Sequence, residues 1–242
     1  MFGRKKQKEF KVDERLRPIA FIMAGNGRWA KRRGMPREYG HKVGAENLRK
    51  VAEYCFSIGI RYMTVYAFST ENWSRPEKEV QSIMSLLGEY VKTADQNDND
   101  IRYIFLGDRS KLSDTLREQI TALEEKTKER GYVLSIALNY GSRDEIVHAV
   151  NALLSKGVSG VTAEELTAQL YTAELPDPDL VVRTGGDFRV SNFLLWQSAY
   201  AEYYFTKTLW PVLSKQEIYR AVVDFYGRQR RFGGLGKTGG KK

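Results

Sequence analysis

Short apolar runs alternate with longer amphipathic segments through most of the chain. The longer runs predict buried strands at 19–23, 62–68, 101–106 and 132–138, and the shorter ones predict strands at 180–182 and 203–205. The run Tyr62–Phe68 is rich in aromatic and β-branched residues, which favour strands. The pattern therefore predicts a sheet whose strands are spread over most of the sequence.

The segments between these runs carry apolar residues at helical spacing. In the segment 77–94 the apolar positions are Val80, Ile83, Met84, Leu87 and Val91. Further helices are expected from about Gly27 and over 44–58, 110–130 and 142–154. Strands that alternate with helices predict a single α/β domain with a mostly parallel central sheet covered by helices on both faces. In such sheets the ligand site lies at the carboxyl ends of the strands.

The formal net charge of +9 is concentrated at the two ends of the chain. Residues 1–17 contain seven basic and three acidic residues, and residues 228–242 contain six basic residues and no acidic one. The body between them is close to neutral, which argues against a nucleic-acid-binding module. Such tails are usually solvated, and the alternative is weak attraction to an anionic membrane surface.

The sequence favours a cytoplasmic protein. Its one cysteine, Cys55, permits no intramolecular disulfide, which fits a reducing compartment. No apolar run approaches the roughly 20 residues that span a bilayer. The basic N-terminus lacks the apolar stretch of a signal peptide. Peripheral contact with the inner face of the membrane remains an option.

The turn after the first predicted strand matches a dinucleotide-binding fingerprint, with Gly25, Gly27 and Ala30 at the spacing G-x-G-x-x-A. That fingerprint also needs an acidic residue about 20 residues further on, at the end of a second strand. Here this distance falls at Glu46, inside a predicted helix. The sequence therefore argues against a nicotinamide cofactor.

Glycines and basic or polar residues gather at the ends of several predicted strands. They are Gly25, Asn26, Gly27, Arg28, Arg37 and His41 after the first strand, residues 69–75 after the second, and Arg183, Arg189 and Ser191 around a later one. Glycines at the start of a helix let backbone N–H groups approach an anion. The planar fork of arginine pairs with two phosphate oxygens at once. A single arginine is more often a surface charge, but the set together suggests two polyanionic groups bound side by side.

These segments resemble the motifs of the cis-prenyltransferases, the undecaprenyl diphosphate synthase family. The matching segments are 25–30, 40–42, 66–76, 139–141, 183–186, 189–197, Glu202 and 230–234. The resemblance implies one catalytic domain over 18–234 with a hydrophobic channel, a basic N-terminal tail at 1–17 and a basic C-terminal tail at 235–242. It also implies a Mg²⁺-dependent homodimer that condenses isopentenyl diphosphate onto farnesyl diphosphate, giving a long polyprenyl diphosphate for the cell-wall lipid carrier.

The resemblance also assigns roles to individual residues. The primer diphosphate would be held by Gly25, Asn26, Gly27, Arg28, Arg37 and His41, and isopentenyl diphosphate by Arg183, Arg189 and Ser191. Arg231 would contribute from the other subunit of the homodimer. Ser69, Asn72, Trp73 and Arg75 would line the junction of the two sites, with Asn72 assisting proton removal and Glu202 contributing to Mg²⁺ binding. Trp29, Thr70, Glu71 and Val190 lie in the same motifs and are assigned to substrate binding with them.

The growing hydrocarbon chain needs a dry channel. The stripe alone is more typical of an ordinary core, but the resemblance indicates that the apolar stripe of 77–94 lines this channel. The small side chain of Ala67, beside the reacting region, fits a channel left open for long products.

The chain departs from the family pattern at Ala24, where an aspartate precedes the sequence Gly-Asn-Gly-Arg. By resemblance that aspartate binds Mg²⁺ and assists departure of the primer diphosphate. Alanine has no oxygen with which to bind a metal, so both phosphate pockets are expected to survive while turnover falls by orders of magnitude.

Two explanations for Ala24 remain open. One is an engineered substitution in an otherwise complete enzyme, and the other is a natural partner subunit without activity. The remaining motif residues are present, which favours the first explanation.

Overall fold

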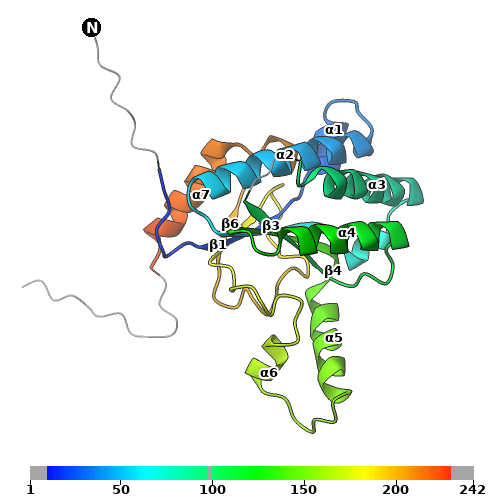
Figure 1. Ribbon diagram of the computed structural model, residues 1–242. Helices are drawn as coiled ribbons and strands as arrows, with labels where there is room; N and C mark the ends of the chain where they lie inside the picture. The colour runs from blue at the N-terminus through cyan, green and yellow to red at the C-terminus, as the bar shows by residue number, and fades with distance from the viewer. Residues whose placement is uncertain (1–9, 97–99, 230–242) are drawn as a thin grey trace, which may run out of the picture.

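A computed structural model describes residues 10–96 and 100–229. Within these residues, six strands form one parallel sheet in the order β3-β4-β2-β1-β5-β6 (Figure 1). The strands are β1 Pro18–Ile22, β2 Tyr62–Ser69, β3 Ile101–Leu106, β4 Tyr132–Tyr140, β5 Leu180–Arg183 and β6 Glu202–Phe205. The predicted single α/β domain with a parallel sheet is confirmed.

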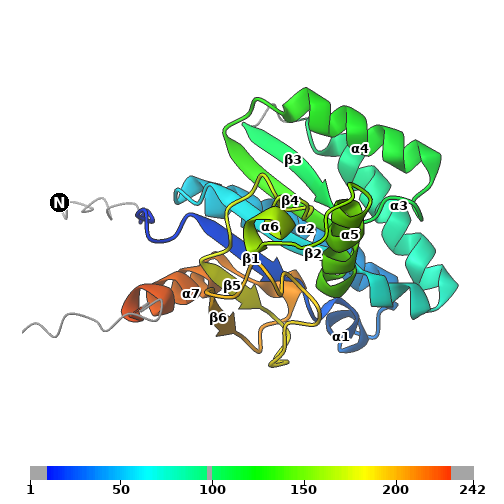
Figure 2. The same ribbon diagram turned by 90° about the horizontal axis from the view of Figure 1, so that it is seen from below.

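Helical segments cover both faces of this sheet. Helices α2, α3, α4 and α7 lie on one face, and α5, α6 and the irregular segment 184–201 lie on the other (Figures 1 and 2). The helices are α1 Asn26–Lys31, α2 Arg37–Ser57, α3 Glu77–Thr93, α4 Asp114–Thr127, α5 Ser142–Leu154, α6 Ala163–Thr167 and α7 Lys215–Gly227, with 3-10 turns η1 Thr70–Ser74 and η2 Trp210–Val212. In the described part of the chain, none of the helices has the length and apolarity needed to cross a bilayer.

The alternation of side chains along β1 divides the core into two layers. Ile19 and Phe21 pack under the four-helix face, whereas Ala20 and Ile22 pack against the segment on the opposite face. All five residues of β1 are buried, as expected for a central strand of a parallel sheet that is covered on both sides. This double burial explains why the strand reads as a continuous apolar run.

The helix boundaries differ from the sequence expectation where a proline or a cap fixes them. The helix expected at 44–58 begins at Arg37, directly after Pro36, whose ring fixes φ at the helix start. The helix expected at 110–130 begins only at Asp114, because the Ser113 hydroxyl accepts a hydrogen bond from the Leu116 amide and caps it.

The sequence analysis missed helix α7. Its buried residues Ile218, Ala221, Val222 and Phe225 follow the i, i+3, i+4, i+7 spacing of an amphipathic helix, so the signal was present. The predicted tail 235–242 lies outside the described residues, as does much of the tail 1–17.

The topology brings three separate segments of the sequence to one edge of the sheet. Strand β1 lies between β2 and β5, and Ile22 is in register with both Tyr66 and Arg183. The residues that follow β1, β2 and β5 therefore meet at their shared carboxyl edge, where a ligand site is expected.

Helix α1 is held against α2 by an unusually close backbone approach at Gly40. A Cβ atom at this position would lie 2.1 Å from the carbonyl oxygen of Asn26. No side chain larger than hydrogen fits there without moving the turn that follows β1. The position of that turn therefore depends on Gly40.

We expect Gly40→Ala to lower the free energy of unfolding by about 1–3 kcal/mol, because overpacking forces the two helices apart. Gly88→Ala is the matched control, since a Cβ in that helix would find its nearest atom 4.0 Å away. The control should raise stability by about 0.5–1 kcal/mol through the higher helix propensity of alanine. Urea unfolding of the three proteins measures both effects, and a Gly40→Ala variant as stable as the parent contradicts the packing argument.

Candidate active site

A polar cavity of about 560 Å³ opens at the carboxyl edge of β1, β2 and β5. Its lining includes many of the predicted site residues, namely Ala24, Asn26, His41, Ser69, Glu71, Asn72, Arg75, Arg183, Arg189 and Ser191. Side chains from three strand ends and from α2 therefore share one space. The rule that places ligand sites at this edge holds here.

The turn after β1 is fixed by its backbone. The carbonyl oxygen of Ala24 accepts hydrogen bonds from the Thr184 hydroxyl at 2.8 Å and from the Trp210 amide at 3.1 Å. Gly25 has φ of 111°, and a Cβ there would lie 2.8 Å from the Leu209 side chain. Only glycine suits this left-handed, crowded position. The turn is therefore held in place with the Ala24 side chain at the cavity.

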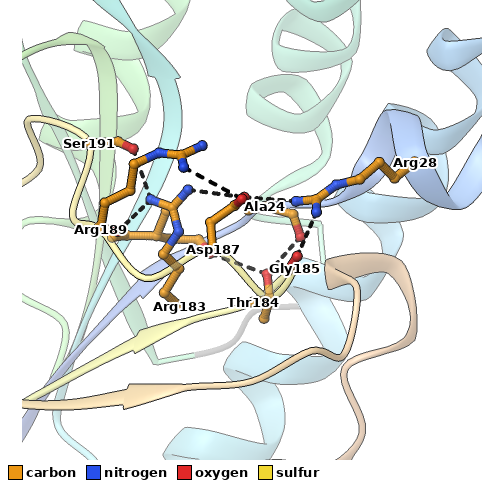
Figure 3. A network of polar contacts seen from close by, with 9 residues as sticks. Ala24, Arg28, Arg183, Thr184, Gly185, Asp187, Arg189 and Ser191 are labelled. Atoms are coloured by element: carbon orange, nitrogen blue, oxygen red, sulfur yellow. Dashed lines mark hydrogen bonds and ion pairs between the residues drawn. The ribbon is translucent and has the colours of Figure 1, made fainter.

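Three arginines meet around the carboxylate of Asp187 (Figure 3). Arg28 follows β1 and reaches Asp187 Oδ2 at 3.0 Å, whereas Arg183 at the end of β5 reaches the same oxygen at 3.4 Å. Arg189 reaches Asp187 Oδ1 at 3.5 Å. Burial acts to raise the pKa of Asp187, but the three arginines outweigh it and hold that pKa below its ordinary value. Three of the predicted arginines thus form one cluster, and the acid at its centre was not predicted.

Arg183 is the buried member of this cluster, with 5% of its side chain exposed. Its Nη1 donates to the carbonyl oxygen of Arg189 at 2.6 Å and to the Ser191 hydroxyl at 2.9 Å. Ser191 and Asn192 both adopt positive φ, at 51° and 63°, which costs a residue other than glycine about 1–3 kcal/mol. Such strain is typical of functional sites, and it presents Ser191 to the cavity.

A second cationic cluster surrounds Glu79, near the start of α3. Its carboxylate, 6% exposed, pairs with Arg37 at 3.0 Å, with His41 Nε2 at 3.1 Å and with Arg75 at 3.2 Å. Burial acts to raise the pKa of Glu79, but its partners prevail and lower it. Burial lowers the pKa of His41 below its ordinary value of 6.5, and the contact with Glu79 opposes that change.

The sequence analysis missed Glu79 although it assigned all three of its partners to substrate binding. Arg75 lies just before α3 in extended backbone, so its i, i+4 spacing to Glu79 was not a helical signal. The contacts with Arg37 and His41 arise from the packing of α2 against α3 and had no counterpart in the local sequence.

The turn η1 closes one side of the cavity. Ser69 and Asn72 cap it reciprocally, and the Ser69 amide donates to Asn72 Oδ1 at 3.2 Å. Glu71 accepts a hydrogen bond from Asn192 at 3.1 Å, which links η1 to the segment after β5. Asn192 also lines the cavity, and the sequence analysis did not assign it to the site.

Several predicted substrate-binding residues lie beside the cavity rather than on its lining. Thr70 hydrogen-bonds Asp144 at 3.0 Å, and the Trp73 indole donates to Asn139 at 2.7 Å. Trp29 is buried and stacks on Tyr39. Val190 packs in the core layer of the opposite face. These side chains hold the loops that carry the site, and none of them contributes to the cavity lining in the described residues.

The structure does not bring Glu202 to the cavity within one chain. Glu202 begins β6 in register with Leu180 at the start of β5, whereas the cavity lies at the opposite end, beyond Arg183. Its carboxylate pairs with Arg228 at 2.7 Å. Arg231, predicted to act from a partner subunit, lies outside the described residues. The role of Glu202 in metal binding stays a prediction.

The side chains at the cavity do not form a magnesium site. Over 10–96 and 100–229, no three acidic, histidine or cysteine side chains converge on one point. Glu79 and Asp187 are each engaged by arginines, Glu71 is hydrogen-bonded to Asn192, and Ala24 has no oxygen on its side chain. Because Mg²⁺ at a phosphate site is usually held by one or two free carboxylates together with the substrate phosphates, the residues present do not fit the predicted metal.

A smaller apolar cavity of about 90 Å³ adjoins the polar one between α2 and α3. The two cavities share Met23, Asn26, His41 and Ala67. The α3 residues on its lining are Ile83, Leu86, Leu87 and Tyr90. The predicted stripe is thus divided: Ile83 and Leu87 line the cavity, whereas Val80 and Val91 are core. An anionic group in the polar cavity and the adjoining first part of an apolar tail in this one fit a single amphiphilic ligand.

We expect Glu79→Gln to lower the pKa of His41 further, because the carboxylate is the group that favours its protonated form. The chain has two histidines, so an NMR titration can follow the His41 signal by itself. A His41 pKa that stays constant or rises in the variant contradicts the proposed electrostatic role of Glu79.

Comparisons with known proteins point to one family. The family model described as putative undecaprenyl diphosphate synthase matches residues 22–233. The isoprenyl transferase of Fusobacterium nucleatum is 50% identical over 220 residues, which cover 90% of this chain and 95% of that protein. The isoprenyl transferase of Clostridium tetani is 43% identical over 93% of this chain and 91% of that protein.

Two solved structures share the fold. Lavandulyl diphosphate synthase from Lavandula x intermedia, in complex with dimethylallyl diphosphate, has a TM-score of 0.86 at 29% identity and covers 91% of this chain and all of its own. A probable undecaprenyl diphosphate synthase from Campylobacter jejuni has a TM-score of 0.76 at 38% identity and covers 92% of this chain and 100% of its own. This chain belongs to the undecaprenyl diphosphate synthase family and is a cis-prenyltransferase.

Proposed function

We propose that this chain binds farnesyl diphosphate and isopentenyl diphosphate for repeated condensation into a long, undecaprenyl-type polyprenyl diphosphate. The observation that carries the proposal is the junction of the two cavities at Met23, Asn26, His41 and Ala67. An arginine-lined space suits two diphosphates, and the apolar space beside it suits a hydrocarbon chain.

Residues of the two cationic clusters are divided between the two substrates. Arg28, Arg37 and His41, with the amides of the turn 25–28, hold the primer diphosphate beside the mouth of the apolar cavity. The buried Arg183, with Arg189 and Ser191, holds isopentenyl diphosphate. Both clusters lie at the carboxyl edge of the sheet, so the reacting carbons are presented to each other from neighbouring pockets.

The carbon–oxygen bond of the primer breaks, and its electron pair leaves with inorganic diphosphate, whose developing charge the arginines stabilise. The double bond of isopentenyl diphosphate attacks the primer carbon, and loss of a proton to the departing diphosphate forms the new cis double bond. Asn72 lines the cavity and is the residue proposed to assist removal of that proton.

Turnover in this chain is proposed to be slow because Ala24 lacks the carboxylate that the family uses for Mg²⁺. The pockets for the two diphosphates do not depend on that carboxylate, since their arginines come from other positions. A non-catalytic partner subunit is the second candidate, and Ala24 is the observation that favours it.

The assembly and location follow the same proposal. A homodimer would form along β6, an edge strand of the sheet, beside Phe188, which is 75% exposed and packs on Phe205. The product would supply the lipid carrier for cell-wall synthesis. The protein would act in the cytoplasm, with peripheral contact at the inner face of the membrane.

We expect Ala24→Asp to raise the incorporation of labelled isopentenyl diphosphate at least about 100-fold, with farnesyl diphosphate and Mg²⁺ present. Ala24→Asn is the matched control, because it has nearly the same size without the charge, and it should stay near the parent. If Ala24→Asp gains nothing while the chain still binds both substrates, the chain is a non-catalytic partner.

We expect Ala67→Leu, made together with Ala24→Asp, to shorten the products, because a larger side chain narrows the junction of the two cavities. Ala122→Leu on the exposed surface of α4 is the matched control and should leave product length unchanged. Chromatography of the dephosphorylated products measures chain length. Full-length products from the double variant would rule out growth of the chain past Ala67.

A further inference from the structure

Asp187 occupies an unusual position, because it is the common acidic partner of three arginines assigned to diphosphate binding. Its two oxygens are shared among Arg28, Arg183 and Arg189 (Figure 3). These arginines come from the segments after β1 and β5, which are far apart in sequence. One carboxylate therefore keeps guanidinium groups from two segments together.

Two of the three contacts between the Asp187 carboxylate and the arginines are long. Charge-assisted N–H···O bonds are typically about 2.7–2.9 Å long, whereas the contacts of Asp187 with Arg183 and Arg189 measure 3.4 Å and 3.5 Å. Three guanidinium charges facing one carboxylate leave a local excess of two positive charges. A ligand with more oxygens and at least two negative charges satisfies this cluster better than Asp187 does.

Asp187 is also free to leave the cluster. Its side chain is 28% exposed, so it can rotate toward solvent. The loop before it is held in place without the carboxylate, because the amides of Gly185 and Gly186 donate to Thr208 and Thr206, each at 2.8 Å. Rotation of one side chain therefore uncovers the arginines without moving the backbone that positions them.

We propose that Asp187 is an internal substitute for the substrate's diphosphate: it holds Arg28, Arg183 and Arg189 together in the empty site and is displaced when a diphosphate binds. The proposal rests on the proposed function for the identity of the ligand. Every incoming anion must compete with this carboxylate. The apparent affinity of the site is therefore its intrinsic affinity multiplied by the fraction of time that Asp187 spends outside the cluster. Asp187 is a residue that sets affinity and takes no part in bond making.

The experiment is a calorimetric titration of inorganic diphosphate into the full chain without Mg²⁺. Asp187→Asn should bind inorganic diphosphate about 5- to 10-fold more tightly than the parent, because the competing charge is gone. Its affinity should also fall more steeply with added salt, because one more cationic charge faces the ligand. Asp114→Asn removes one acid from the exposed surface of α4 and should bind like the parent.

Asp187→Glu keeps the competing charge and should bind no more tightly than the parent. Urea unfolding shows whether each variant is folded, and tighter binding by Asp187→Asn itself requires an intact site. If the parent binds inorganic diphosphate and Asp187→Asn binds it equally or more weakly, this inference is overturned while the proposed function stands. Asp187 is then an ordinary structural partner of the arginines. If neither protein binds inorganic diphosphate, the proposed diphosphate pocket fails and this inference fails with it.

Discussion

The structure depends on keeping several guanidinium groups close together at one edge of a parallel sheet. Like charges at these separations repel strongly unless counterions lie between them. Two carboxylates, Asp187 and Glu79, supply that compensation, and each is surrounded by three cationic or polar partners. Both retain a lowered pKa despite burial, so both remain charged at neutral pH. The site is thus assembled before any substrate arrives.

The fold places an apolar space directly beside this charged edge. Helices α2 and α3 cover one face of the sheet and leave a small cavity between them, which opens into the polar cavity at Ala67 and His41. The close approach at Gly40 fixes the turn that carries Ala24. Charge recognition and hydrocarbon binding therefore depend on the same packing of two helices against one strand end.

The sheet and the arginine-lined site could be predicted from the sequence because both leave local signals. Apolar runs located all six strands of the described chain, and the glycine-rich turn and strand-end arginines located the cavity. Glu79, Asp187 and Asn192 escaped notice because their partners are brought together by the fold or by an irregular loop. The length of α4 was overestimated because the spacing of apolar residues continues past the cap at Ser113.

The central claim is that the arginine-lined edge binds the diphosphates of two prenyl substrates side by side. A crystal structure of this chain with farnesyl diphosphate and a non-reactive thio analogue of isopentenyl diphosphate tests it directly. We expect one diphosphate on Arg183, Arg189 and Ser191, a second beside His41 and Arg75, and the farnesyl tail between α2 and α3. A diphosphate bound away from this edge, or a tail that leaves the apolar cavity empty, would contradict it.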